Sequence, residues 1–254
     1  MHYGQFPIRL RVKRALILLP CLCAFLMGCV EYRQILTLNP DGSGTFEVVY
    51  KVDSDTAQAL LQSGTLGDDL DAGTPGRLFN EPQVRKDFAP YEADGIELEI
   101  VDITETGRDE TMRLGFRFED LDGLLGTPFF AQSTVSLRRD AHGDLVLTQT
   151  LSGAGPEWGP TIDLSMAETD AALREQLQGV VVEFQLVVPG AIRATNADRM
   201  DGRTAVWKFD PSIDRDALAR AQQAQFRVVF DGSGSTMPDV GPQQIRLSPT
   251  EPGG

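Results

Sequence analysis

Few residue types in this chain could carry out covalent or metal chemistry. The chain holds three cysteines (Cys21, Cys23 and Cys29) and two histidines (His2 and His142). If a leader of 28 residues is removed, one thiol and one imidazole remain, which excludes thiol catalysis and the usual zinc ligand sets. A serine hydrolase needs Ser, His and a carboxylate, commonly in a Gly-x-Ser-x-Gly elbow that is absent here. We therefore predict no catalytic residues, no metal and no cofactor.

Carboxylates are the remaining groups with catalytic capacity. A glycosidase needs one protonated acid and one ionised carboxylate across the scissile bond, and 37 Asp and Glu give no basis for choosing a pair. Asp68, Asp69 and Asp71 lie in a Gly/Asp/Thr-rich stretch whose spacing matches no EF-hand loop and which no Glu closes. We interpret that stretch as a solvated acidic loop.

Two other side chains, Trp158 and His142, are of types that often contact ligands. Trp158 lies between Pro156-Glu157 and Gly159, and an indole there is a candidate ligand contact because it could stack on a sugar. The alternative, which we favour, is a loop aromatic that covers the edge of the core. His142 lies in an Asp/Gly turn and is expected to face solvent.

The net charge excludes polyanionic partners. Without the four basic residues of the leader, 19 Lys and Arg remain against 37 Asp and Glu, a net charge of about −18. No basic cluster lies outside the leader, so nucleic-acid binding is not expected. Asp41-Gly42-Ser43-Gly44 precedes a strand pattern and not a helix, so it is a turn and not a phosphate loop.

The first 28 residues resemble a leader. Arg9, Arg11, Lys13 and Arg14 form a basic region, and the 14 residues 15–28 are apolar apart from the break at Pro20. A transmembrane helix needs about 20 apolar residues, and no later stretch approaches that length. We expect residues 1–28 to be a cleaved signal peptide and the mature chain to have no transmembrane helix.

The end of this leader resembles the lipobox of bacterial lipoproteins, with Leu26, Met27 and Gly28 before Cys29. The resemblance implies that Cys29 carries the lipid and becomes the mature N-terminus. Two or three acyl chains, palmitate among them, would hold the chain permanently on a membrane. In a Gram-negative cell, Val30 after the cysteine favours the outer membrane. The alternative is an ordinary secretory signal that Cys29 happens to follow.

Alternating apolar residues predict strands, most of them in hairpins. Turn residues separate residues 32–38 from 46–52, 96–100 from 112–118, 134–138 from 145–151, and 192–195 from 204–209. In the second hairpin, Glu97 and Glu99 would lie near Arg113 and Arg117. Residues 180–188 are nearly all apolar, as in a strand buried on both faces. The last strand is expected at 226–230.

Short helices interrupt the strands. Capping and periodicity predict helices at 54–64, 79–92, 120–125, 165–179 and 214–224, with the capping-box helix at 165–179 the clearest. This order predicts an α+β fold, mainly an antiparallel sheet built from hairpins with three or four short helices packed on it.

The predicted organisation has four parts. Residues 1–28 are the signal peptide, 29–30 the acylated end and a short tether, and 31–230 the α+β ectodomain. The ectodomain is either one domain or two lobes divided near residues 152–165. In residues 231–254, twelve of 24 residues are Gly, Pro or Ser, which predicts a mobile tail with 245–247 as its one ordered contact.

Two segments resemble the LppM-type domain of bacterial lipoproteins. One is the opening, where the lipobox cysteine leads into an apolar strand and an Asp-Gly-Ser-Gly turn. The other runs from residue 180 to 209, through Pro189-Gly190, Asn196, Asp201-Gly202 and Trp207. Val188 stands where the family more often has Phe, and the transmembrane helix of many relatives is absent. The resemblance implies an envelope-surface α+β domain without catalytic residues and with lipid or glycolipid contact, and it transfers no functional site.

These observations predict a non-enzymatic lipoprotein of the cell envelope. Its partners would be the membrane, through Cys29, and a lipid, glycolipid or envelope protein. Three alternatives stay open: a lipid carrier with an internal cavity, a carboxylate-dependent envelope glycosidase, and a structural spacer.

Overall fold

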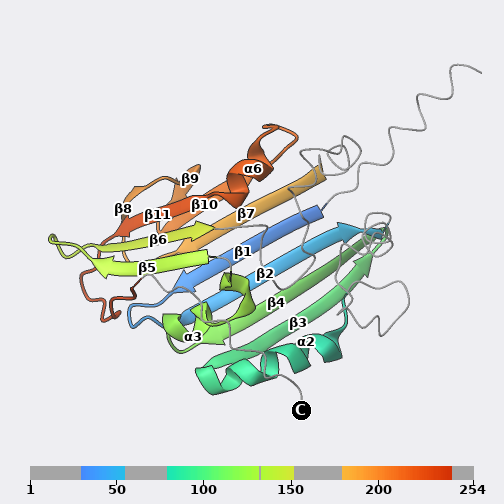
Figure 1. The fold of residues 1–254 in the computed structure, drawn as a ribbon, viewed down its shortest axis with the longest axis horizontal. Coiled ribbons are helices and arrows are strands. Elements are labelled where there is room, and N and C mark those ends of the chain that lie inside the picture. The colour runs from blue at the N-terminus through green and yellow to red at the C-terminus, as the bar shows by residue number, and fades with distance from the viewer. Residues whose placement is uncertain (1–29, 55–78, 132, 152–178, 242–254) are drawn as a thin grey trace, which may run out of the picture.

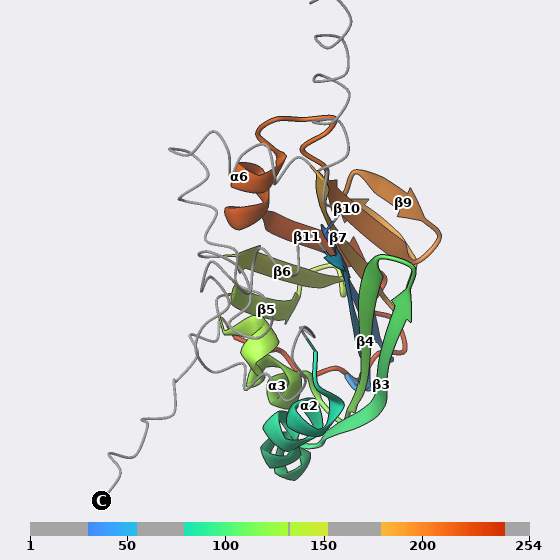
Figure 2. The ribbon, with the colours of Figure 1, turned by 90° about the vertical axis from the view of Figure 1, so that its right-hand side faces the viewer.

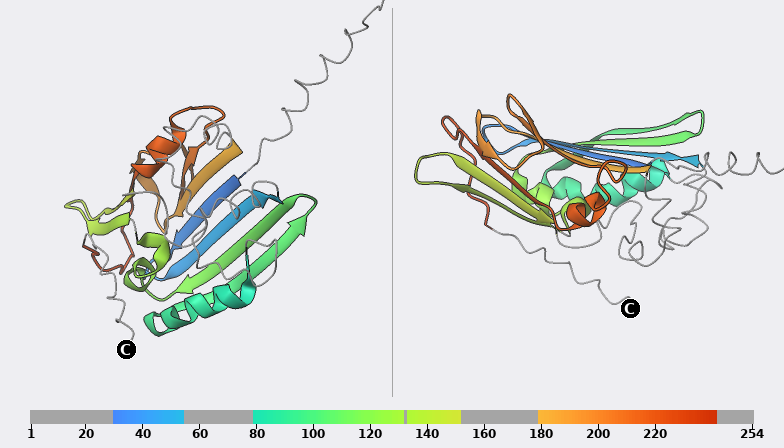
Figure 3. Two further views of the ribbon diagram at one scale, coloured as in Figure 1. Left: turned by 45° about the vertical axis from the view of Figure 1, so that its right-hand side comes forward. Right: turned by 90° about the horizontal axis from the view of Figure 1, so that it is seen from above.

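The computed structural model describes residues 30–54, 79–131, 133–151 and 179–241, which form two β-sheets. Seen from above, the larger sheet is one layer, and the smaller sheet and the helices lie on one of its faces (Figure 3). The described residues are therefore richer in strand, and poorer in helix, than the sequence predicted. No helix among them is long and apolar enough to cross a membrane.

The larger sheet has seven strands in the order β3-β4-β2-β1-β7-β10-β9 (Figure 1). All neighbours are antiparallel except β1 and β7, which pair in parallel. The sequence predicted a sheet built mainly from hairpins, and this parallel pair is not a hairpin. More than 140 residues of chain separate the end of β1 at Leu38 from the start of β7 at Val180. The strands are β1 (Val30–Leu38), β2 (Gly44–Asp53), β3 (Ile96–Thr106), β4 (Asp109–Phe118), β7 (Val180–Val187), β9 (Arg199–Asp201) and β10 (Thr204–Phe209).

Strict alternation explains why one face of this sheet is buried. Every second residue of β1 and β2 is buried, and those between are exposed or half-buried. The same holds for the second half of β7, so the expectation of a strand buried on both faces is wrong: Val181, Gln185 and Val187 are half-buried on the outer face. A continuous apolar run does not by itself show that both faces are covered.

The smaller sheet has four strands in the order β5-β6-β11-β8. They are β5 (Ser133–Arg139), β6 (Leu145–Leu151), β8 (Ile192–Thr195) and β11 (Gln225–Phe230). The predicted hairpin of 192–195 with 204–209 is wrong, because β8 pairs with β11 whereas β10 pairs with β7 and β9 in the other sheet. The chain crosses between sheets at Asn196, whose side chain accepts from Trp207 Nε1 at 3.2 Å and donates to the Gln225 carbonyl at 2.6 Å.

Three α-helices and two 3₁₀-helices lie among the described residues. Asn80 caps α2 (Glu81–Phe88), which continues into η2 (Ala89–Asp94), and Asp120 caps α3 (Leu121–Leu125), which precedes η3 (Pro128–Phe130). The last helix is α6 (Ala217–Gln222). These elements match the expectations at 79–92, 120–125 and 214–224. The helices expected at 54–64 and 165–179 lie almost wholly outside the described residues.

One hydrophobic cluster fills the space between the two sheets. Phe184 of the larger sheet meets Phe226 of the smaller one, with ring centroids 4.8 Å apart. Phe46 packs against Phe129 and Phe130, which lead into β5. The described residues thus share one hydrophobic core. The division expected near 152–165 lies outside them.

The outer face of the larger sheet carries the charged side chains. Arg117 forms ion pairs with Glu97 and Glu99 across β3 and β4, as the sequence predicted. Arg113 instead pairs with Glu47 of β2, at 2.7 Å. The difference arises because β4 lies between β3 and β2, and the expected hairpin included only β3 and β4. Such exposed pairs contribute little to stability.

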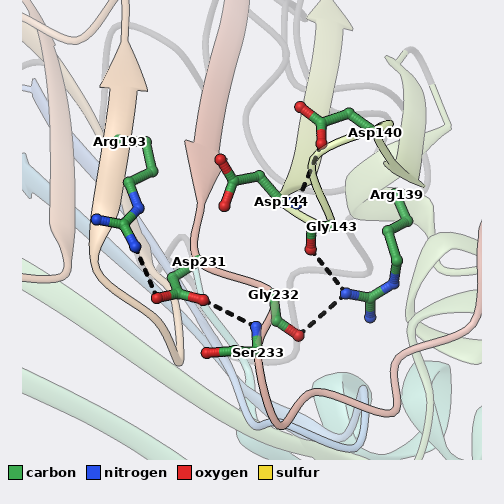
Figure 4. A network of polar contacts seen from close by, with 8 residues as sticks. All are labelled: Arg139, Asp140, Gly143, Asp144, Arg193, Asp231, Gly232 and Ser233. Carbon is green, nitrogen blue, oxygen red and sulfur yellow. Dashed lines mark hydrogen bonds and ion pairs between the residues drawn. The ribbon is translucent and has the colours of Figure 1, made fainter.

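Residues 231–241, expected in the mobile tail, pack on the fold instead. Val240 and Leu137 exchange two backbone hydrogen bonds, of 2.7 and 2.9 Å, so the segment covers the edge of β5. Arg139 donates to the carbonyls of Gly143 and Gly232, and Asp231 accepts from Arg193 and Ser233 (Figure 4). The Gly/Pro/Ser-rich composition of this segment predicted a mobile tail, although two of its apolar side chains, Met237 and Val240, are buried. Residues 245–247 lie outside the described part of the chain.

Candidate functional site

The anchor predicted from the sequence lies next to the fold but outside the described residues. Leu26, Met27, Gly28 and Cys29 are not described, and β1 begins at Val30. Since β1 has β2 and β7 on its two sides, the chain enters the larger sheet near its middle and not at an edge. Trp158, the candidate ligand contact, also lies outside the described residues.

A polar cluster lies inside the core, and it is the candidate site. Tyr32 of β1 donates a hydrogen bond of 2.9 Å to Oε1 of Gln34, two residues further along the same face. Gln34 is only 5% exposed, although its neighbours on that face are apolar or aromatic. Its amide nitrogen makes no hydrogen bond with another described residue. Tyr50 of β2 lies beside Tyr32, with ring centroids 5.0 Å apart.

Burial determines the electrostatics of the two tyrosines. Desolvation raises the pKa of Tyr32 far above its ordinary value, and a hydrogen bond with Tyr50 opposes part of that rise. Desolvation likewise raises the pKa of Tyr50, and the proximity of Tyr32 raises it further. Both phenols therefore stay neutral and act as hydrogen-bond donors and acceptors, not as bases.

A second buried glutamine lies in the smaller sheet. Gln149 of β6 is 8% exposed and pairs in register with Phe226 of β11. In the larger sheet Gln34 pairs in register with Phe184. Phe184 and Phe226 are in contact, so each glutamine lies one strand away from a point where the two sheets meet. No hydrogen bond joins the Gln149 side chain to the rest of the described structure.

Glu110 of β4 adds a carboxyl group to the same buried face. It is 6% exposed, and its Oε1 accepts from the backbone nitrogen of Phe79 at 3.3 Å. Phe79 in turn packs on Tyr50, with ring centroids 6.2 Å apart. Within the larger sheet, the inward polar groups thus extend from β4 through β2 to β1.

This arrangement places groups that can hydrogen-bond within an apolar interior. Buried amides normally find partners, because an unpaired one costs free energy. The two glutamine amides can each donate and accept, whereas the cluster has no histidine, thiol or cation that would assist a reaction. No group of His, Cys, Asp and Glu able to hold a metal occurs in the described part of the chain.

The sequence contains a signal for these buried polar groups. Gln34 interrupts the inward series of β1, and Gln149 interrupts the series Leu145, Leu147 and Leu151 of β6. A polar residue in an apolar register is informative. Their burial in one core, however, depends on how the sheets pack. The sequence instead drew attention to His142, which lies exposed in the β5–β6 turn as expected.

Replacing Gln149 by leucine is expected to raise the free energy of unfolding by about 1–2 kcal/mol, because the buried amide has no partner among the described residues. Urea denaturation measures the change. Gln185→Leu is the matched control, since Gln185 is half-buried on the outer face and donates to Glu183 at 2.6 Å. A loss of stability in Gln149→Leu would show that the amide is satisfied in the folded protein.

Comparisons with known proteins assign no family to the chain. No protein-family profile and no curated protein sequence matches it. Among solved structures, it is similar to the folded domain of LppM from Mycobacterium tuberculosis, with a TM-score of 0.39, 15% identity, and coverage of 80% of this chain and 89% of that domain. It is also similar to yeast LTA4 hydrolase in complex with bestatin, with a TM-score of 0.28 and 9% identity. That match covers 72% of this chain and 26% of the hydrolase. Neither likeness carries a functional residue to this chain.

Proposed function

We propose that this protein is a lipid-anchored lipoprotein of the bacterial envelope whose α+β domain binds an envelope component without catalysing a reaction. The observation that carries the proposal is the position of Val30. It follows the lipobox cysteine directly and is already the first residue of β1. An acylated Cys29 would therefore hold the domain against its membrane with almost no tether. In a Gram-negative cell we place it on the outer membrane, from Val30 after the cysteine.

The bound component is, in this proposal, an amphipathic molecule such as a lipid or glycolipid. The buried amides of Gln34 and Gln149 would receive its polar group, and the aromatic core around them its apolar part. This supports the second candidate function as well, a lipid carrier that encloses its ligand between the sheets. The resemblance of residues 29–53 and 180–209 to LppM-type domains agrees with either.

The anchor is tested by Cys29→Ser. We expect this variant to lose incorporation of labelled fatty acid and to leave the membrane fraction, because no other thiol of the mature chain can be acylated. Cys23→Ser is the matched control, since Cys23 lies in the leader and would be removed with it. A Cys29→Ser chain that is still labelled and still sediments with membranes would contradict the anchor.

Ligand binding is tested by native mass spectrometry on residues 30–254 purified from a bacterial envelope. The proposal expects a co-purifying lipid mass, and less of it in a Gln34→Leu, Gln149→Leu double variant. The bare sequence mass, with no lipid taken up on titration, would contradict lipid binding and direct the search to protein partners. Sugar binding that depends on Trp158, with hydrolysis lost on replacing one Asp or Glu, would instead support the glycosidase.

A further inference from the structure

One exposed apolar side chain lies at the end of the fold where the anchor would enter. Ile213 is 82% exposed, and Met200, at 54%, is the other large hydrophobic side chain exposed among the described residues. Ile213 belongs to the loop of residues 210–216, between β10 and α6. In Figure 2 this loop is the uppermost part of the described fold.

Strand register places the loop beside Val30. Val30 pairs with Val180 at the start of β7, and Phe209, the last residue of β10, pairs with Val182. Since β10 runs antiparallel to β7, the chain passes the level of Val180 within two residues of Phe209. The loop therefore lies at, or just beyond, the sheet end from which Cys29 continues.

Local hydrogen bonds hold the loop in one conformation. Asp210 accepts from the backbone nitrogen of Ser212 at 3.1 Å, and its carbonyl accepts from Ile213 and Asp214 at 3.0 and 2.9 Å. The Ile213 side chain is thus presented outward by a formed turn and not by an extended strand.

The charges of the loop and of its ion-pair partners balance, and Asp198 and Glu183 beside Lys208 add two negative charges. Lys208 pairs with Asp210 at 3.1 Å, and Arg220 pairs with Asp214. Arg215 and Asp216 add one charge of each sign. The loop can approach a lipid surface without a concentrated negative charge, although the whole chain is strongly acidic.

We propose that the 210–216 loop is a second membrane contact, with Ile213 inserted at the boundary between headgroups and acyl chains beside the lipid on Cys29. This inference rests on the proposed anchor and adds an orientation: the sheet end at Val30 faces the bilayer, and the opposite end points away. An apolar side chain in that boundary gains by leaving water, and its neighbours stay in the headgroup layer.

The test places a fluorophore at each exposed apolar position of the full, acylated chain. Ile213→Cys and Met200→Cys variants are labelled with an environment-sensitive NBD group and reconstituted into phosphatidylethanolamine/phosphatidylglycerol vesicles. The introduced cysteine is the only free thiol, because Cys29 is acylated and Cys21 and Cys23 leave with the leader. Met200 is the control: it pairs with Ala205 opposite Leu186, six residues and about 20 Å along β7 from Val180.

We expect the emission of the fluorophore at position 213 to shift to the blue and to be quenched by doxyl-labelled lipid. The fluorophore at position 200 should show neither effect. Flotation of the same sample separates the two proposals. A chain that floats with its vesicles but shows no quenching at 213, or equal quenching at both positions, overturns the loop contact and leaves the anchor standing. A chain that does not float overturns both.

Discussion

A Gly44→Ala variant is expected to lose about 3 kcal/mol of unfolding free energy. Gly44 opens β2 and pairs with Leu38 of β1 and Phe118 of β4. A Cβ atom at this position would lie 2.0 Å from the carbonyl oxygen of Thr37 and 2.5 Å from Cζ of Phe118. The first clash is with backbone, so it cannot be relieved by turning a side chain. β1, the strand that follows the proposed anchor, would have to shift.

Thermal and urea denaturation of the variant measure this loss. Gly241→Ala is the matched control, because no atom of the described residues lies within 4 Å of its Cβ position and its φ is not positive. The control should change stability by less than about 0.5 kcal/mol. An equal effect of the two substitutions would show that β1 and β2 are further apart than described.

A Phe46→Ala variant is expected to lose about 3–5 kcal/mol, the cost of removing a large aromatic side chain from a core that cannot collapse around the gap. Phe46 is fully buried on β2. Its ring lies 5.0 Å from that of Phe129 and 5.3 Å from that of Phe130, so it joins the larger sheet to the segment that leads into β5. The cavity would therefore open between the two sheets.

Chemical denaturation followed by far-ultraviolet circular dichroism measures the change. Phe46→Leu should lose less, because most of the volume remains. Ile213→Ala should lose almost nothing in a soluble chain, since Ile213 is exposed. A Phe46→Ala variant as stable as the parent would mean that the smaller sheet does not pack over β2.

Membrane attachment through Cys29 and ligand binding in the interior are independent of each other. Cys29 concerns where the protein is held, and Gln34 and Gln149 concern what it could bind. Cys29→Ser should leave lipid uptake intact, and Gln149→Leu should leave acylation intact. A protein that is anchored but has no ligand would fit the structural spacer, whereas one that binds lipid would fit the carrier.

Local patterns in the sequence were sufficient for most of the individual elements, although not for β9, which lies in a stretch expected to be a turn. Alternation on β1 and β2 identifies both strands and their buried face, because side chains in a strand have a period of two whatever the strand pairs with. Asn80 and Asp120 cap helices where side-chain oxygens can accept from free backbone N–H groups. The lipobox resemblance is also local, which is why Cys29 could be named without any fold.

What tertiary structure alone decided is which strands are partners. Three pairings illustrate this: β1 pairs with β7, β8 pairs with β11 and not with β10, and Val240 covers the edge of β5. In each case the local pattern of a segment does not indicate which segment it pairs with. The candidate site has the same origin. Gln34 and Gln149 each break an apolar register, but they are buried in one core only because the two sheets pack together, as at Phe184 and Phe226. Periodicity is a property of a few consecutive residues, whereas partner choice depends on burying distant apolar faces against each other.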